Sequence, residues 1–155
     1  MERKRNTGRW LLWVCFLVYC ALMLWLLFSR EQYPVEGDYW ERMRRNVNLM
    51  PFATVRLYLR VLAEPALAYL IPHAVVNLAG NVVMFIPLGF FLPTVLPKLR
   101  KWWKTVLCTV LMVTVIELIQ LFTLLGSCDV DDLMLNVAGA WLGYGLWRIA
   151  GRFRK

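Results

Sequence analysis

The feature that most constrains this chain is an apolar run near its start. Residues 10–28 contain no charged side chain over nineteen positions, close to the ~20 apolar residues that one helix needs to cross a bilayer core. A cleaved secretory signal has a shorter apolar core and a cleavage site of small residues, whereas this run ends in Phe28-Ser29-Arg30. The run therefore predicts a retained transmembrane helix.

The composition indicates that this helix is not the only one. Of the 155 residues, 60% are apolar and 18% are charged, whereas soluble domains have about 45–50% and 25%. Mean hydropathy is +0.54. A chain this short cannot bury so much apolar surface in water, so a soluble globule and a disordered chain are both excluded.

Three further segments are apolar enough to form membrane helices, at residues 74–96, 103–125 and 133–150. The chain is expected to reach the first of these by a re-entrant or interfacial approach that ends at Pro72. We therefore expect an all-α, polytopic membrane protein, a four-helix transmembrane bundle with an outer interfacial segment between the first and second helices. Residues 1–29 would hold the basic N-terminus and first helix, and residues 30–155 the rest of the membrane domain.

Basic residues are concentrated in three places. Residues 1–9, 97–104 and 148–155 each contain four Lys or Arg, which together are twelve of the eighteen in the chain, and Glu2 is the one acid among them. Because basic residues mark the cytoplasmic ends of membrane helices, both termini are predicted to be cytoplasmic. Nucleic-acid binders carry basic residues on one face of a soluble module, so the net charge of +8 indicates the bilayer, and not nucleic acid, as the partner.

This topology brings scattered polar residues to a similar depth in the outer half of the bundle. Two asparagines lie near the outer start of the second helix, an acid and a glutamine near the outer end of the third, and three aspartates in the turn before the fourth. The predicted ligand-binding set is Asn77, Asn81, Glu117, Gln120, Asp129, Asp131, Asp132 and Asn136.

Glu117 is the most informative member, because a carboxyl group inside a span costs several kcal/mol and usually faces a bundle interior or a watery cavity. One interpretation is that a protonated Glu117 and Gln120 only join helices by hydrogen bonds to Asn136 or Asn81. The other is a functional site, which the clustering of the eight residues favours.

The acidic turn also has two interpretations. Several carboxylates on a flexible loop suit Ca²⁺, but the turn lacks the spacing of a known calcium loop, and we expect neither a metal nor another cofactor. Alternatively, Asp131 or Asp132 caps the N-terminus of the fourth helix. The four cysteines have no spacing typical of a disulfide framework or a metal site.

Two further patterns bear on packing and lipid contact. Gly139 and Gly143 form a G-x-x-x-G pair, which lets another helix approach closely and which we interpret as packing. Residues 40–62 mix five arginines with large apolar side chains. That mixture is typical either of a segment in the headgroup plane with its arginines on phosphates, or of a plain amphipathic connector.

Taken in order, four motifs resemble the VanZ-like family of small bacterial membrane proteins, named for a teicoplanin-resistance protein. They are Asn48-Leu49-Met50-Pro51-Phe52, Asn77-x-x-x-Asn81-x-x-x-Phe85-x-Pro87-x-Gly89, Glu117-x-x-Gln120, and Asp129-Val130-Asp131-Asp132-x-x-x-Asn136-x-x-Gly139-x-x-x-Gly143. The resemblance covers residues 48–147. It implies a multi-pass protein of the bacterial cytoplasmic membrane that lowers susceptibility to teicoplanin-type lipoglycopeptides. Some members carry an arginine just before the acidic turn, where this chain has Ser127 and Cys128.

Three functions fit these observations. The first is binding or modification, around Glu117, of a lipid-linked cell-wall precursor or another envelope component, or of a lipoglycopeptide's acyl anchor. The second is an intramembrane enzyme acting on a lipid headgroup, with Glu117 as general acid or base and Asp131 or Asp132 as its partner. The third is structural, a bundle that stabilises another envelope protein through Gly139 and Gly143. Self-association is compatible with all three.

Overall fold

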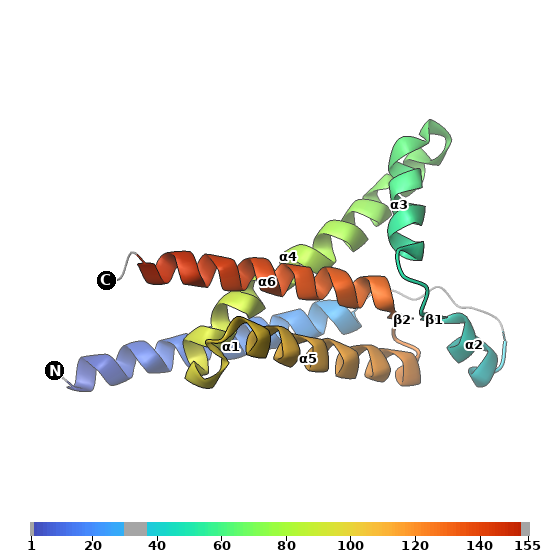
Figure 1. The fold of residues 1–155 in the computed structure, drawn as a ribbon. Helices are drawn as coiled ribbons and strands as arrows, with labels where there is room; N and C mark the ends of the chain where they lie inside the picture. Colours follow the sequence, from blue (N-terminus) through green and yellow to red (C-terminus); the bar gives the residue numbers. More distant parts are fainter. Residues whose placement is uncertain (1, 30–36, 153–155) are drawn as a thin grey trace.

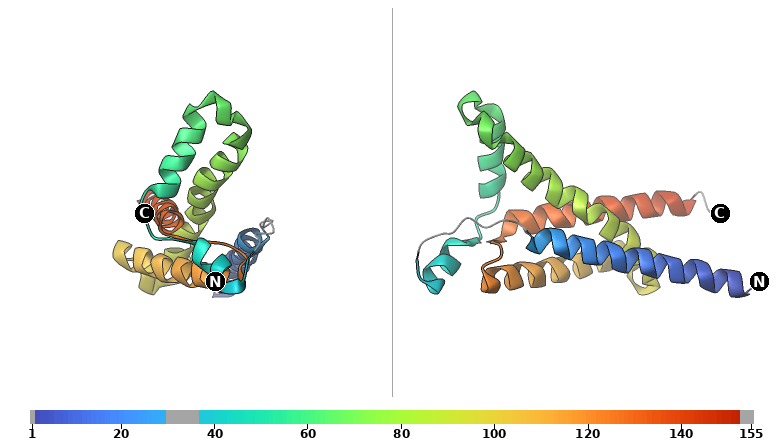
Figure 2. Two further views of the ribbon diagram at one scale, coloured as in Figure 1. Left: turned by 90° about the vertical axis from the view of Figure 1, so that its right-hand side faces the viewer. Right: turned by 180° about the vertical axis from the view of Figure 1, so that it is seen from behind.

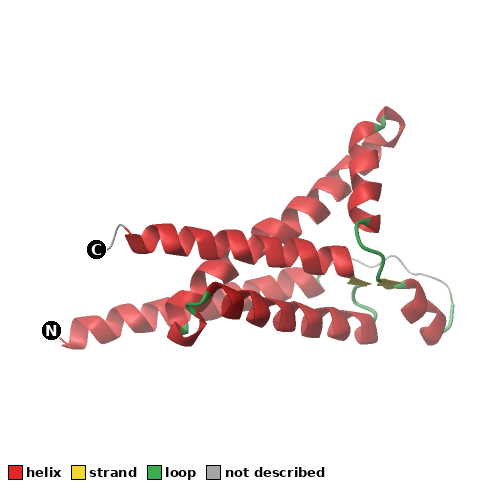
Figure 3. Ribbon diagram, in the orientation of Figure 1, coloured by secondary structure: helices red, strands yellow, loops and turns green. Residues whose placement is uncertain are grey.

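The computed structural model of this chain is built almost entirely from helices (Figures 1 and 3). It describes residues 2–29 and 37–152; Arg154 and Lys155, part of the predicted basic C-terminus, lie outside these residues. Four long helices dominate it, and they are α1 (Glu2–Phe28), α4 (Ile71–Val95), α5 (Trp102–Thr123) and α6 (Val130–Arg152). The all-α expectation is therefore confirmed.

Three segments are long and apolar enough to cross a membrane. They are Gly8–Phe28 in α1, Pro65–Val95 in α4 with the short helix before it, and Trp102–Thr123 in α5. The remaining long helix, α6, is not among them, because its glycines, its Asn136 and its Arg148 lower its hydropathy. The fourth span therefore stays a prediction.

The long helices are arranged so that α4 crosses the others (Figures 1 and 2). The helices α1, α5 and α6 run roughly along one direction, and the start of α1 and the end of α6 lie at the same end of the molecule. The N-terminal half of α4 leaves the bundle and forms a projecting hairpin with α3 (Ala53–Ala63).

The helix α4 begins earlier than the sequence suggested. It starts at Ile71 rather than at residue 74, and the 3-10 helix η1 (Pro65–Leu70) leads directly into it. Pro72 lies in the first turn of α4, where its missing N–H is not needed and its fixed φ suits a helix. The residues expected to form an interfacial approach are therefore η1 and this first turn.

The helices α4 and α6 approach each other closely because glycine removes the side chain on both helices. A Cβ at Gly89 would lie 1.8 Å from the carbonyl oxygen of Ala140. A Cβ at Gly143 would lie 1.9 Å from the carbonyl oxygen of Ile86, and one at Gly139 would lie 2.1 Å from that of Val82. The packing interpretation of the G-x-x-x-G pair is thus confirmed, and both glycines are used inside this chain rather than presented to another protein.

An apolar core surrounds this contact, and α1 packs against it. Phe85, Leu88 and Leu92 of α4 are completely or almost completely buried. Phe16 of α1 packs against the ring of Phe91 at 6.0 Å between centroids. The Tyr19 hydroxyl donates to the backbone carbonyl of Met84 at 2.7 Å, so α1 is held to α4 by both apolar and polar contacts.

The segment between α1 and α3 contains one strand of a very short, two-stranded sheet. After α2 (Tyr39–Arg45), strand β1 (Val47–Asn48) pairs in parallel with β2 (Cys128–Asp129), with Val47 opposite Cys128 and Asn48 opposite Asp129. The helix α2 is joined to α5 by a hydrogen bond from the Tyr39 hydroxyl to the carbonyl of Phe122 at 2.9 Å. The sheet therefore brings the segment before α3 beside the acidic turn before α6.

The glycine contact predicts a sharp difference between neighbouring substitutions on α6. Gly143→Ala forces two backbones apart, because its Cβ meets the Ile86 carbonyl rather than a flexible side chain, and should lower the free energy of unfolding by about 1–3 kcal/mol. Gly145→Ala adds a Cβ with nothing within 4 Å and should leave stability unchanged or slightly higher. Unfolding in detergent micelles measures both, and equal effects would contradict the packing.

Candidate functional site

Asp131 is completely buried and holds the start of another helix. Its two carboxylate oxygens accept hydrogen bonds from the backbone N–H groups of Phe52 and Val55, at 2.5 and 3.0 Å. Phe52 precedes α3, has a left-handed φ of 63° and makes no side-chain cap of its own. A carboxylate is well suited to the free N–H groups and positive dipole end of a helix. Asp131 therefore caps α3, although it lies almost eighty residues further along the chain.

Asp129 caps α6 and also contacts the segment before α3. Its Oδ1 accepts from the N–H of Asp131 at 2.8 Å, next to the start of α6. Its Oδ2 accepts from the Asn48 amide at 3.2 Å and from the Thr54 hydroxyl. The side-chain cap of α6 therefore comes from Asp129 and not from Asp131 or Asp132 as predicted, because Asp129 precedes α6 and the Asp131 carboxylate faces α3. Asp131 and Asp132 do lie in the first turn of α6, where negative charge suits the helix dipole.

A second polar cluster lies between the long helices. The Asn81 amide of α4 donates to Oδ1 of Asp132 at the start of α6. On α5, Oε2 of Glu117 accepts from the Cys128 thiol at 3.8 Å. Glu117, Asn81 and Asn136 are 6%, 2% and 5% exposed, so this cluster is buried before any membrane is considered. By helical spacing, Asn77 lies one turn before Asn81 on α4, and Asn136 lies one turn after Asp132 on α6. We call Asn77, Asn81, Glu117, Asp132 and Asn136 the interhelical cluster.

Three oxygen atoms of this cluster are buried without a hydrogen-bond partner among the described residues. They are Oδ1 of Asn77, Oε1 of Glu117 and Oδ1 of Asn136. Leaving a buried polar atom unsatisfied costs about 1–3 kcal/mol. All three atoms are acceptors, so a group that supplied N–H or O–H donors would satisfy them.

The thiol of Cys128 is a donor to this cluster rather than a nucleophile. Burial raises the pKa of the Cys128 thiol, and the nearby carboxylates of Glu117 and Asp129 raise it further. Because the thiolate is the reactive form of cysteine, Cys128 stays protonated at neutral pH. It can therefore donate to Glu117, as its geometry shows.

Gln120, unlike the rest of the predicted set, contacts α1. Its side-chain amide donates to the carbonyl oxygen of Leu27 at 2.9 Å. Leu27 lies in the last turn of α1, where carbonyl groups lack partners within the helix. Gln120 thus joins α5 to the end of α1.

The eight predicted residues are therefore divided among three tasks. Asp129 and Asp131 cap the starts of α6 and α3. Gln120 joins α5 to α1, and the other five residues make up the interhelical cluster. The sequence does not predict a partner for Thr54 or Cys128. The motif containing Asn48 could have pointed to Thr54, since both bind the same aspartate.

The structure also describes His73 and the possible metal ligands. The ring of His73 packs against that of Tyr58 at 5.7 Å between centroids, which joins α3 to α4 in the projecting hairpin. Within residues 2–29 and 37–152, no group of three or more His, Cys, Asp or Glu side chains is arranged to hold a metal ion. The carboxylates of Asp129 and Asp131 instead accept hydrogen bonds from protein donors.

Comparison with known proteins now decides the family. The sequence profile of the VanZ/LLP1 family matches residues 16–151, which include both carboxylate caps and the whole interhelical cluster. This chain belongs to the VanZ/LLP1 family. Among VanZ/LLP1 relatives, Protein VanZ of Enterococcus faecium is 24% identical over 135 residues, covering 87% of this chain and 72% of that protein. No solved structure matches. The resemblance inferred from the four motifs is therefore confirmed, and the chain is a membrane protein.

The Asp131 cap predicts a local loss of order. Asp131→Ala removes both acceptors from the start of α3 and should lower the free energy of unfolding by about 1–2 kcal/mol, as other cap deletions do. Amide hydrogen exchange should speed up at Phe52 and Val55 before it does in α5. Asp38→Ala is the matched control, because Asp38 precedes α2 without a side-chain cap bond. Unchanged exchange at Phe52 and Val55 in Asp131→Ala would rule out the cap.

Proposed function

We propose that this VanZ/LLP1 protein acts at the outer face of the bacterial cytoplasmic membrane, where its interhelical cluster binds the headgroup of a lipid-linked envelope component or the corresponding part of a lipoglycopeptide. Binding of this kind limits the action of teicoplanin-type lipoglycopeptides, either by holding the drug or by holding the envelope component that it needs. The protein is then a binding protein whose site is built from α4, α5 and α6.

The observation that carries this proposal is the set of three unpartnered acceptors. Buried acceptors without donors are uncommon in folded proteins, and three of them belong to one predicted cluster. A ligand rich in O–H or N–H groups, such as a sugar or an amine, supplies the missing donors. A bare phosphate would instead meet these acceptor oxygens and the carboxylate of Asp132.

The proposed topology has four spans, with both termini in the cytoplasm. At 1.5 Å per residue, α6 is about 35 Å long, which exceeds the ~30 Å of the bilayer core. The start of α1 and the end of α6 lie at the same end of the molecule, as an even number of spans requires. With the basic ends inside, the interhelical cluster falls in the outer half, where an envelope ligand arrives.

We favour binding over catalysis because of the hydrogen bonds that Asp131 makes and the protonation state of Cys128. Both oxygens of Asp131 already accept backbone N–H groups, so Asp131 is a poor partner for Glu117 in acid–base chemistry. Burial and nearby carboxylates raise the pKa of Cys128, which removes a thiolate nucleophile. The resistance role itself is supported by membership of the family and by similarity to Protein VanZ.

A susceptibility assay tests the proposal. A teicoplanin-sensitive host expressing the wild-type protein should tolerate more drug than a host with an empty vector. Asn136→Leu and Glu117→Leu each remove one unpartnered acceptor and should weaken ligand binding about tenfold, which is about 1.4 kcal/mol per lost hydrogen bond. Both variants should therefore lose most of the protection.

The control is Glu64→Gln, which neutralises an acid that is exposed and only pairs with Arg60 at 4.0 Å. All proteins are compared at equal membrane levels. Protection by the control and not by the two cluster variants supports the proposal. Equal protection by all four proteins would show that the cluster only packs helices, and no protection by any would show that the family role does not extend to this chain.

A further inference from the structure

A cavity lies at the opposite end of the bundle from the interhelical cluster. It has a volume of about 610 Å³, within the range of about 300–1,000 Å³ that small-molecule sites occupy. The first turn of α5 and the second half of α6 form its walls. Residues that line it include Trp102, Trp141, Tyr144, Gly145, Arg148 and Ile149.

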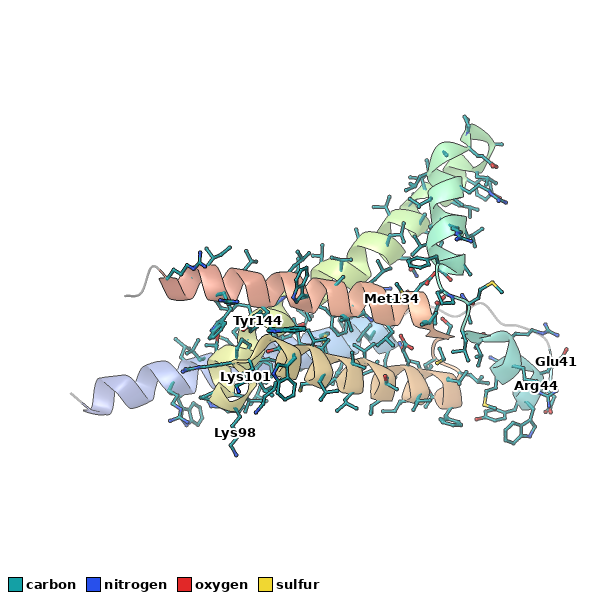
Figure 4. The ribbon with its side chains drawn as sticks, viewed as in Figure 1. Glu41, Arg44, Lys98, Lys101, Met134 and Tyr144 are labelled. Carbon is teal, nitrogen blue, oxygen red and sulfur yellow. The ribbon has the colours of Figure 1, made fainter. Side chains whose placement is uncertain are left out.

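The walls of this cavity are apolar and aromatic, with one cation among them. Trp102 and Trp141 are both 57% exposed. Their indole rings therefore line the cavity and leave its volume unfilled. Tyr144 also lines the cavity, and its hydroxyl donates to the carbonyl of Arg100 at 2.8 Å. Figure 4 shows the Tyr144 side chain between α6 and the start of α5. Arg148 supplies the cation, and its side chain is exposed.

The charged side chains on the two segments that form the cavity are all basic. They are Lys98, Arg100, Lys101, Lys104, Arg148 and Arg152, and residues 97–116 and 133–152 contain no Asp or Glu. The ion pairs found among the described residues join Arg45 to Glu41 and Arg60 to Glu64, which lie elsewhere. None of these six basic side chains forms an ion pair with another side chain that the structure describes.

We propose that this cavity binds one anionic phospholipid, with an acyl chain against the tryptophans and the phosphate on Arg148. Apolar walls beside unpaired basic residues match an ester-linked phosphate with its chain, and the proposed topology puts this end at the cytoplasmic leaflet, where anionic lipids attract basic residues. Zwitterionic lipids offer no net charge to Arg148. The site is separate from the interhelical cluster and uses none of its residues.

Gly145 allows the site to be closed without disturbing the fold. A Cβ at Gly145 meets nothing within 4 Å, and this residue lines the cavity. Gly145→Leu therefore fills the space that the acyl chain would occupy. Gly80→Leu is the matched control, because a Cβ at Gly80, on α4, also meets nothing within 4 Å.

The charge is tested by a second pair of variants. Arg148→Gln removes the cation from the cavity, whereas Lys98→Gln removes a cation at the same end that does not line it. In Figure 4 the side chain of Lys98 extends away from the helices. A basic side chain near an anionic membrane surface contributes enough to change relative affinity about fivefold.

The experiment is native mass spectrometry of the full chain in detergent, titrated with phosphatidylglycerol and with phosphatidylcholine of the same acyl chains. The wild-type protein should bind one phosphatidylglycerol about fivefold or more tightly than phosphatidylcholine. Gly145→Leu should not bind this lipid. Arg148→Gln should still bind it, but its preference for phosphatidylglycerol over phosphatidylcholine should fall about fivefold. The two control variants should behave as wild type.

Three results would overturn the proposal. They are equal binding of the two lipids by the wild-type protein, unchanged binding by Gly145→Leu, and displacement of the lipid by millimolar inorganic phosphate, which would show that only the phosphate is recognised. The drug-susceptibility assay uses other residues. Failure of one proposal therefore leaves the other standing.

Discussion

The close contact of α4 with α6 determines where the other elements lie. Gly89 on α4 and Gly143 on α6 each allow the opposing backbone to approach at a distance that a Cβ would forbid. In a bilayer, where lipid tails are as apolar as the side chains, such backbone contact is a main source of helix association. The same contact brings Asn81 onto Asp132, and the start of α6 then places Asp129 and Asp131 beside β1 and α3.

The acidic residues of this protein do two different kinds of work. Asp129 and Asp131 are satisfied by protein donors and determine how the outer segment joins the bundle. Glu117 has one oxygen that accepts from a thiol and one that has no hydrogen-bond partner in the part of the chain that the structure describes. A buried oxygen without a hydrogen-bond donor destabilises the folded state. A binding site is the physical reason that best accounts for three such acceptors in one cluster.

The sequence predicted those parts of the fold that depend on local composition. Apolar runs gave α1 and α5 with ends within a few residues of those observed, apart from the polar first turns of α1, and the G-x-x-x-G spacing gave the small-residue face of α6. Partners far apart in the chain could not be predicted. Asp131 bonds to Phe52 and Gln120 bonds to Leu27, and no local pattern relates those positions. The fourth span, in α6, stays a prediction, since its polar and small residues reduce the apolar signal.

The central claim is that the unpartnered acceptors of the interhelical cluster hold a donor-rich envelope molecule. The most direct measurement is native mass spectrometry of the protein extracted gently from bacterial membranes, comparing the wild-type protein with a Glu117→Leu, Asn136→Leu double variant and the Glu64→Gln control. The account predicts that wild type and control retain the same sugar- or amine-bearing species and that the double variant loses it while remaining folded. Retention of that species by the folded double variant, or its absence from the wild-type protein, would contradict the account.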